Sequence, residues 1–232
     1  MVIKKEITTI GFDADDTLWV NEPNFREAEQ QFCELLENYI PHEETIKRLF
    51  DIEMKNLHLY GYGAKNLIIS MVETICSVIK TEVSTDFIND ALNIGIKLLH
   101  KPLILIDGVE NVLKKLHGKY RLVMITKGDL IEQERKIAKS GLARYFNHIE
   151  IMSHKRSEDY VNMLIKIDCA PENFVMIGNS LKSDILPVLE LNSHAIHIPF
   201  HITWEHEMHD EEINHPKFTV IQSIGELIEI FL

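Results

Sequence analysis

Short apolar, β-branched runs alternate with amphipathic stretches through most of the chain, and this pattern predicts strands separated by helices. The apolar runs suit buried strands, because a strand covered on both faces shows little alternation with polar residues. The stretches between them repeat apolar residues three and four positions apart, as amphipathic helices do. This order indicates βαβ units and an α/β fold with a parallel sheet. The predicted strands are 7–12, 120–126, 148–152, 174–178, 195–198 and 217–220, and the helices between them are 109–116, 130–140, 160–167 and 185–191.

The alternation stops between about residue 20 and residue 101, where the apolar positions have only helical spacing. Consecutive helices without strands predict an all-α insertion into the α/β fold. The helices are expected at 25–39, 43–60, 65–79 and 86–99, with breaks at Pro41, 61–63 and 80–84. The predicted domains are an α/β core of residues 1–18 and 102–232, and a helical domain of residues 19–101.

The predicted helix 130–140 has recognisable boundary signals. Asp129 and Glu132 form a capping pair at its start, and Gly141 follows its last residue. A capping pair satisfies free backbone N–H groups at a helix N-terminus, and glycine suits the residue after a helix. These signals predict where the helix begins and ends.

Composition and charge narrow the class of protein. The chain has 232 residues, of which 45% are apolar and 26% charged, so it can bury a full core. Its formal net charge is −12, and no dense run of lysine and arginine is present. Nucleic-acid binding depends mainly on clustered cations, so we expect no nucleic-acid partner.

Cysteine usage and hydropathy favour a cytoplasmic location. The three cysteines, Cys33, Cys76 and Cys169, are widely spaced and form no C-x-x-C pair, so we expect reduced, buried thiols. The first dozen residues lack the features of a signal peptide, and no uncharged apolar run reaches the roughly 18 residues of a membrane span. No membrane partner is therefore expected.

The densest group of reactive side chains follows the first predicted strand, at Asp13, Asp15, Asp16 and Thr17. In parallel sheets ligands bind beyond the carboxyl ends of the strands. An extended chain would place the side chains of Asp13 and Asp15 on one side, where two oxygens face one centre. Carboxylates crowded in this way favour a cation, and hard oxygen ligands suit Mg²⁺, which also accepts phosphate oxygens. The alternative is an acidic turn in which Asp16 and Thr17 hydrogen-bond the local backbone.

Four motifs in chain order resemble those of the haloacid dehalogenase-like hydrolase superfamily. FDADDTL at 12–18 resembles its first motif, D-x-D-x-T, and VMITKG resembles the second through Thr126. Lys155 in IMSHKRSEDY resembles the lysine of the third motif, and GNSLKSD at 178–184 resembles the acidic fourth motif. The motifs span the whole chain, and each follows a predicted strand. The resemblance implies a Rossmann-like three-layer core with a helical cap inserted after the first strand.

The resemblance also implies catalytic roles. Asp13 would be the nucleophile that forms an aspartyl-phosphate, and Asp15 would protonate the leaving oxygen and later deprotonate water. Thr126 and Lys155 would bind phosphoryl oxygens, where compensating charge stabilises the transition state. Lys127 is a further candidate for substrate contact. Each has a structural alternative, because Thr126 also suits a strand end and Lys155 lies beside Arg156, another cation.

The predicted metal ligands for Mg²⁺ are Asp13, the backbone carbonyl of Asp15, Asp184 and Asn179. Asn179 departs from the family pattern, in which an aspartate is frequent at this position. Its amide still offers an oxygen but removes one negative charge, so the departure bears on metal affinity. Ser180 and Ser183 are candidates for contact through water.

The expected function is a Mg²⁺-dependent phosphatase that acts on a small phosphorylated metabolite, as a monomer or homodimer. Asp15 favours phosphoryl chemistry over dehalogenation, because a halide leaving group needs no proton. Cap size and the TKGD segment resemble the phosphoglycolate-phosphatase and nucleotidase branches. The alternatives are a phosphomutase with the same aspartate chemistry, and a low-activity binding or regulatory protein that retains the fold.

Overall fold

The computed structural model describes residues 6–209 and 211–232, which divide into two compact units. The α/β unit comprises the described residues up to Glu22 together with Leu103–Lys127 and Gln133–Leu232. The helical unit comprises Pro23–Pro102 and Gly128–Glu132. A short segment that follows the second strand is therefore grouped with the helices.

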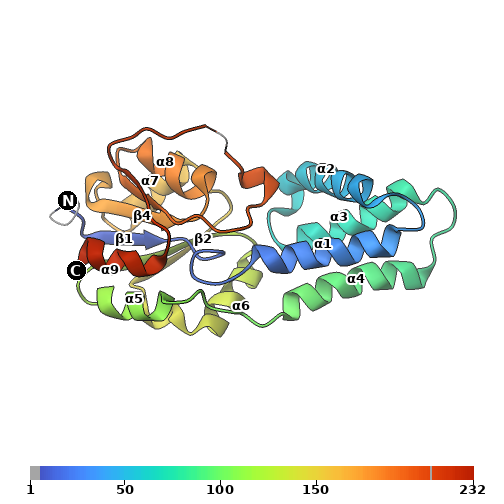
Figure 1. Ribbon diagram of the computed structural model, residues 1–232, viewed down its shortest axis with the longest axis horizontal. Helices are drawn as coiled ribbons and strands as arrows, with labels where there is room; N and C mark the ends of the chain where they lie inside the picture. Colours follow the sequence, from blue (N-terminus) through green and yellow to red (C-terminus); the bar gives the residue numbers. More distant parts are fainter. Residues whose placement is uncertain (1–5, 210) are drawn as a thin grey trace. The chain divides into compact units, whose positions relative to one another are not determined.

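The α/β unit contains a parallel sheet of six strands, as the sequence predicts (Figure 1). Their order is β3-β2-β1-β4-β5-β6, so β1 lies in the middle between β2 and β4. Phe12 at the end of β1 is level with Met124 on β2 and Ile177 on β4. The segments that follow these three strands therefore leave the sheet at one edge. The strands are β1 (Thr9–Phe12), β2 (Arg121–Lys127), β3 (His148–Met152), β4 (Phe174–Gly178), β5 (His194–His197) and β6 (Phe218–Val220).

Helices cover both faces of this sheet and complete the three-layer core (Figure 1). One face is covered by α5 (Val109–Leu116), α9 (Leu227–Phe231) and the later turns of α6 (Leu130–Ser140). The other is covered by α7 (Ser157–Lys166) and α8 (Leu186–Leu189). Each face has its own apolar cluster, because the side chains of a strand alternate between the two faces of its sheet.

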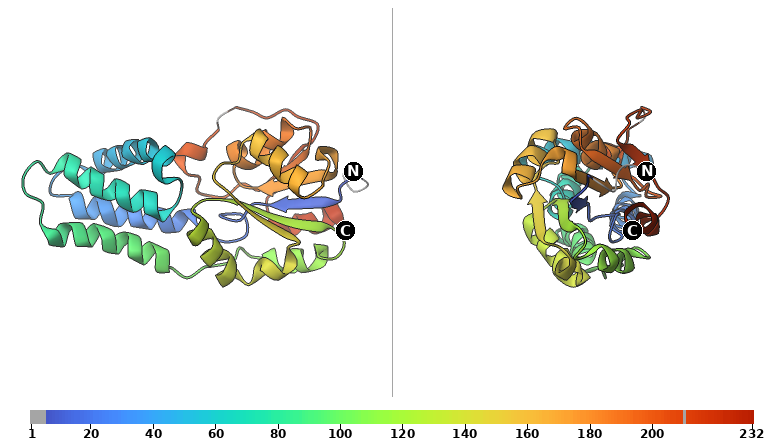
Figure 2. Two further views of the ribbon diagram at one scale, coloured as in Figure 1. Left: turned by 180° about the vertical axis from the view of Figure 1, so that it is seen from behind. Right: turned by 90° about the vertical axis from the view of Figure 1, so that its left-hand side faces the viewer.

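The helical unit is an all-α structure built from α1 (Glu22–Leu36), α2 (His42–Tyr60), α3 (Ala64–Val78) and α4 (Thr85–His100). Figure 2 shows from behind that these helices run along one another, and α3 packs against both α2 and α4. Gly95 permits the α3–α4 contact, because a Cβ at this position would lie 2.0 Å from Cγ1 of Ile68. No helix among the described residues is long and apolar enough to cross a membrane.

The start of α6 differs in part from the predicted capping pair. Asp129 does cap the helix, because its Oδ1 accepts the Glu132 N–H at 3.0 Å. The Glu132 carboxylate instead accepts the N–H of Ala64 at the first turn of α3, at 2.9 Å. Gly63 makes room for this contact, since a Cβ there would lie 2.7 Å from Oε2 of Glu132. Glu132 therefore also caps α3, a helix distant in sequence.

The three cysteines are free thiols with different exposures. Cys33 is buried, Cys169 is half-buried, and Cys76 is exposed. The expectation of three buried thiols is therefore wrong for Cys76 and only partly met for Cys169. Cys76 lies in the last turns of α3, on the side of the helix that faces solvent.

Candidate active site

Three charged side chains from distant parts of the sequence meet beyond the end of β1. Nζ of Lys155 donates to Oδ1 of Asp13 at 2.5 Å and to Oδ1 of Asp184 at 2.7 Å. The Lys155 and Asp184 side chains are each only 1% exposed, so solvent screens the cluster little. The structure thus brings together the residues that the first, third and fourth motifs single out.

The cluster carries more negative than positive charge. The pKa of Asp13 is raised to about 7, chiefly by burial and also by the charge of Asp184, although Lys155 opposes both effects. Burial lowers the pKa of Lys155, but the charges of Asp13 and Asp184 outweigh burial and hold that pKa well above its ordinary value. When Asp13 and Asp184 are both ionised, one buried ammonium leaves a net negative charge, so a further cation would favour the ionised form of Asp13.

The chain around Asp184 is shaped to hold its carboxylate in place. Asp184 lies in a single turn of π-helix, Leu181–Ile185, and its Oδ2 accepts the N–H of Ser180 at 3.0 Å. A Cβ at Gly178 would lie 2.3 Å from this same oxygen, so only glycine permits the approach. The hydroxyl of Tyr160 on α7 stabilises the turn by donating to the carbonyl of Ser183 at 2.9 Å. Such π-turns often occur at functional sites.

Asn179 lies where oxygens converge beside Asp13. Thr17 Oγ1 donates to Asp13 Oδ2 at 2.9 Å, and Asn179 Oδ1 lies 3.3 Å from the same hydroxyl oxygen. With the amide turned end for end, its nitrogen donates to Asp13 Oδ2 at 3.3 Å and to the Asp15 carbonyl at 3.2 Å. The loop is held by His197, whose Nε2 hydrogen-bonds the Asn179 carbonyl at 2.9 Å.

This convergence fits a hard divalent cation. With the oxygen of Asn179 toward Asp13, a carboxylate, a main-chain carbonyl and an amide oxygen lie together, and none of the three can donate a hydrogen to the others. A cation such as Mg²⁺ satisfies such a set, whereas the amide nitrogen satisfies it when no cation is bound. The donors available around Asp13 therefore match the predicted metal in chemical type.

The Asp15 side chain points to a different set of partners from that of Asp13. Its carboxylate accepts from Nε1 of Trp19 at 2.6 Å, Nε2 of Gln133 at 2.9 Å and Nζ of Lys136 at 3.0 Å. The Asp13 and Asp15 carboxylates therefore share none of the hydrogen-bond partners found among the described residues. Asp15 pairs with Trp19 across a turn at residues 16–18, in which the Leu18 N–H donates to the Ala14 carbonyl at 2.8 Å.

Asp16 hydrogen-bonds the local backbone, which was the structural alternative for this residue. It has a left-handed backbone with φ of 60° and accepts the N–H groups of Asn21 at 2.8 Å and Glu22 at 3.0 Å. Burial raises the pKa of Asp16 to about 7 although the Asn21 hydrogen bond lowers it. Asp16 therefore shapes the entry into α1, whereas Thr17 bonds the Asp13 carboxylate.

Thr126 and Lys127 stand side by side at the end of β2 but differ in their contacts. The Thr126 side chain is buried, with 1% of the residue exposed, and its hydroxyl has no hydrogen-bond partner among the described residues. This hydroxyl is therefore available to donate to a ligand. Nζ of Lys127 donates to Oγ of Ser183 at 3.0 Å and to the carboxylate of Glu207.

Several residues of the site were not identified from the sequence. Gln133 and Lys136 could have been identified from the sequence, because they lie beside Ile137 on the buried side of α6. A surface helix usually carries apolar residues on that side, so polar residues there suggest a functional contact. Glu207 gives no such signal, since it lies in an irregular segment between β5 and β6. Its contact with Lys127 depends on the tertiary fold alone.

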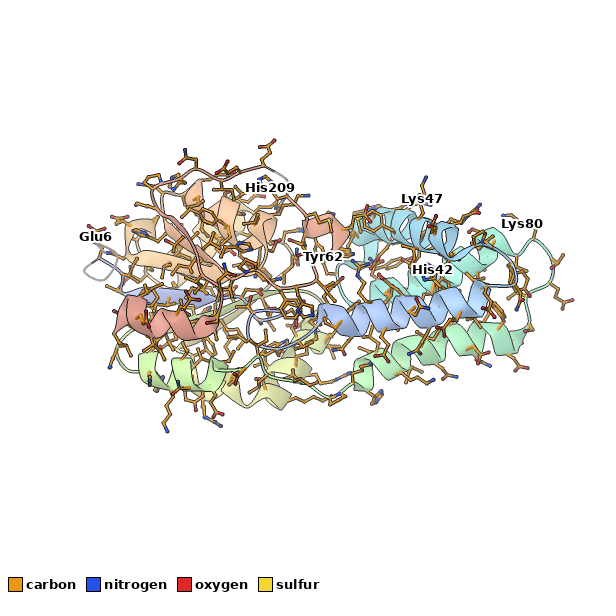
Figure 3. The ribbon with its side chains drawn as sticks, viewed as in Figure 1. Glu6, His42, Lys47, Tyr62, Lys80 and His209 are labelled. Carbon is orange, nitrogen blue, oxygen red and sulfur yellow. The ribbon has the colours of Figure 1, made fainter. Side chains whose placement is uncertain are left out.

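The histidine-rich segment 194–215 is spread over different surroundings. The His206 ring lies against that of Trp204 at 4.9 Å, and His209 belongs to the same segment (Figure 3). No group of three or more His, Cys, Asp or Glu side chains in the described part of the chain is placed to hold a metal. The donor set beside Asp13 differs from such a group because it includes a main-chain carbonyl and an amide.

Comparisons with known proteins agree on one family. The sequence profile of haloacid dehalogenase-like hydrolases matches residues 7–188. A haloacid dehalogenase-like family hydrolase from Xanthomonas campestris is 34% identical, with a TM-score of 0.87 over 97% of this chain and 90% of its own. A hydrolase of this type from Bacillus subtilis, solved bound to magnesium, shares the fold with a TM-score of 0.64 at 19% identity, over 97% and 99% of the two chains. Glyceraldehyde 3-phosphate phosphatase of Methanothermobacter thermautotrophicus is 31% identical over 116 residues, which cover 48% of this chain and about half, 51%, of that protein.

Proposed function

The chain belongs to the haloacid dehalogenase-like hydrolase family, and we propose that it is a Mg²⁺-dependent phosphatase of a small phosphomonoester that forms an aspartyl-phosphate on Asp13. The observation that carries this proposal is the buried carboxylate of Asp13, held between the Thr17 hydroxyl and the Lys155 ammonium. The identity with a phosphatase over about half its length supports the reaction class, and the magnesium in a structural neighbour supports the metal.

Asp13 supplies the nucleophilic oxygen, and its neighbours bind the group under attack. A carboxylate attacks phosphorus once the negative charge of the phosphoryl oxygens is compensated. Lys155 provides a fixed positive charge for this purpose, and the unpartnered Thr126 hydroxyl donates to a phosphoryl oxygen. The buried position of both groups strengthens these interactions relative to water.

Magnesium, when bound, supplies the additional positive charge that neutralises the phosphoryl oxygens. Its proposed ligands are the carboxylate of Asp13, the carbonyl of Asp15 and the amide oxygen of Asn179. Asp184 remains in the proposed set, and its carboxylate is oriented by hydrogen bonds from Lys155 to Oδ1 and from the Ser180 N–H to Oδ2.

Asp15 is proposed as the acid that protonates the leaving alkoxide and then as the base that activates water. Its carboxylate is held by Trp19, Gln133 and Lys136, so this role requires that these hydrogen bonds be exchanged for one to the substrate. Lys136 is a positioning residue in this scheme, because it holds the Asp15 side chain in place until the substrate arrives. Asp15 must then take up a proton, from water or from a phosphomonoester monoanion, before it can transfer that proton to the leaving oxygen.

The helical unit is proposed to serve as the cap of the enzyme, in keeping with the predicted helical domain of residues 19–101. In this role it would exclude water from the reacting groups and contact the leaving group of the substrate. Substrate choice would then depend on both units of the chain.

The proposal is tested by phosphate release from p-nitrophenyl phosphate and from small phosphomonoesters, with Mg²⁺ and with excess chelator. The wild-type protein is expected to release phosphate only with Mg²⁺, and Asp13→Asn is expected to lower the rate at least about a thousandfold. Asp90→Asn, an exposed change on α4, is the matched control. Equal rates for wild type and Asp13→Asn would refute the assignment, and transfer of the phosphoryl group to a second sugar hydroxyl would favour a mutase.

A further inference from the structure

The carboxylate of Glu207 occupies a site built from three donors. Glu207 ends a single 3₁₀ turn, Glu205–Glu207, between β5 and β6. It accepts from Nζ of Lys127, from Oγ of Ser180, and from Oγ of Ser183 at 2.7 Å. The side chains of Lys127 and Glu207 are only 14% and 12% exposed. One ammonium and two hydroxyls around a carboxylate constitute a receptor for an anion.

The donors of this receptor come from both sides of the strand that carries the nucleophile. Lys127 is the last residue of β2, whereas Ser180 and Ser183 follow β4, and β1 lies between these two strands. Lys127 also follows Thr126 directly, and Ser183 precedes Asp184. Glu207 therefore joins the two flanks of the site at the edge of the sheet where the phosphoryl-binding groups lie.

The contacts of Glu207 with Lys127, Ser180 and Ser183 determine the ionisation state of Glu207 in the receptor. Burial alone would raise the pKa of Glu207, but the charge of Lys127 and hydrogen bonds from Lys127, Ser180 and Ser183 together lower it to about 2. Glu207 is therefore ionised at neutral pH and compensates Lys127. Without it, Lys127 and the two hydroxyls would attract a second anionic group on a bound phosphomonoester.

From this arrangement we infer that Glu207 is a specificity-determining residue that selects phosphomonoesters with an uncharged leaving group and rejects those with a second negative charge. This inference rests on the proposed function, because the phosphate must lie beside Asp13. Rejection follows from charge: a second anion near Lys127 would meet the Glu207 carboxylate, whereas hydroxyl groups would meet no such repulsion.

The test compares 2-phosphoglycolate, whose leaving group carries a carboxylate, with glycerol 1-phosphate, whose leaving group is neutral. Glu207→Gln keeps the size of the side chain and an acceptor for Lys127 but removes the charge. The measured quantity is the ratio of kcat/KM for 2-phosphoglycolate to kcat/KM for glycerol 1-phosphate. Glu205→Gln is the matched control, since it removes one charge from an exposed position of the same turn.

The ratio is expected to rise at least about fivefold in Glu207→Gln and to stay within about twofold of wild type in Glu205→Gln. A smaller rise in Glu207→Gln, or an equal rise in the control, would overturn the inference. Lys127→Gln provides a second, independent variant, because it leaves the Glu207 charge uncompensated and is expected to lower the same ratio. An unchanged or higher ratio in Lys127→Gln would also count against the inference.

Binding measurements separate this inference from the proposed function. In an Asp13→Asn background, calorimetry gives the dissociation constants of both compounds with Glu207 and with glutamine at this position. The same fivefold change in their ratio is expected. If no phosphomonoester is hydrolysed by wild type, the proposed function fails while the binding ratio still decides the inference. Failure of both compounds to bind would overturn it.

Discussion

Glu207→Gln is expected to weaken the α/β unit at neutral pH and to have progressively less effect in acid. The folded protein lowers the pKa of Glu207 from 4.5 to about 2, which corresponds to about 3 kcal/mol of preference for the charged form. Glutamine retains an oxygen that accepts from Lys127, so we expect a loss of about 2 kcal/mol of unfolding free energy at pH 7. The low exposure of both side chains means that solvent screens this contact little.

The direction of the pH dependence follows from the lowered pKa. A carboxyl group whose pKa is lower in the folded than in the unfolded protein stabilises the fold fully above its unfolded value, here 4.5. That stabilisation disappears as the pH falls toward the folded value of about 2. The difference in unfolding free energy between wild type and Glu207→Gln is therefore expected to be constant from about pH 7 to about pH 5.5 and to shrink steadily below.

Urea unfolding followed by tryptophan fluorescence measures this difference in the relevant part of the chain. Both tryptophans, Trp19 and Trp204, belong to the α/β unit. Glu205→Gln serves again as the control, and its exposed position predicts little change at any pH. A difference for Glu207→Gln that stays constant down to about pH 3, or the same profile in the control, would refute the reasoning.

Three further predictions concern other parts of the molecule. Gly178→Ala places a Cβ 2.3 Å from an oxygen of Asp184, so phosphatase kcat is expected to fall at least about tenfold. An unaltered kcat would show that Asp184 is not needed at this position. Asn179→Asp is expected to bind Mg²⁺ more tightly in calorimetry, and an unchanged or lower affinity would show that this side chain does not face the ion. Gly95→Ala is expected to destabilise the helical unit by about 1 to 3 kcal/mol, because its Cβ would lie 2.0 Å from Ile68. Thermal unfolding followed by far-UV circular dichroism measures this loss, and Ile68→Ala should restore part of it. No loss would mean that α3 and α4 do not pack this closely.

The strands and helices could be predicted because their hydrophobic periods are set by burial on the two faces of the sheet. The run at 174–178, for instance, is apolar throughout, and all of β4 is buried. The proximity of Asp13, Lys155 and Asp184 could also be predicted from the sequence, because each residue follows a predicted strand of one parallel sheet. Topology alone brings the carboxyl ends of such strands to one edge.

The direction of individual side chains could not be predicted in the same way. The Asp15 carboxylate accepts hydrogen bonds from Gln133 and Lys136 of α6, a helix distant in sequence, and no periodic pattern records that contact. Glu132 accepts the N–H of Ala64 at the start of α3, where Gly63 leaves space for its carboxylate. Such contacts depend on where a second segment, distant in sequence, happens to pass.

The amide at Asn179 has a physical advantage that an aspartate would lack. The end of its side chain lies 3.3 Å from Asp13 Oδ2 and 3.2 Å from the Asp15 carbonyl oxygen. A carboxylate here would face both oxygens with no hydrogen to donate, beside two carboxylates that already share one lysine. An amide donates to them when no cation is bound and, turned end for end, offers an oxygen when one is. If Asn179 faces Mg²⁺ as proposed, the amide would lower the affinity for the metal and stabilise the site when the metal is absent.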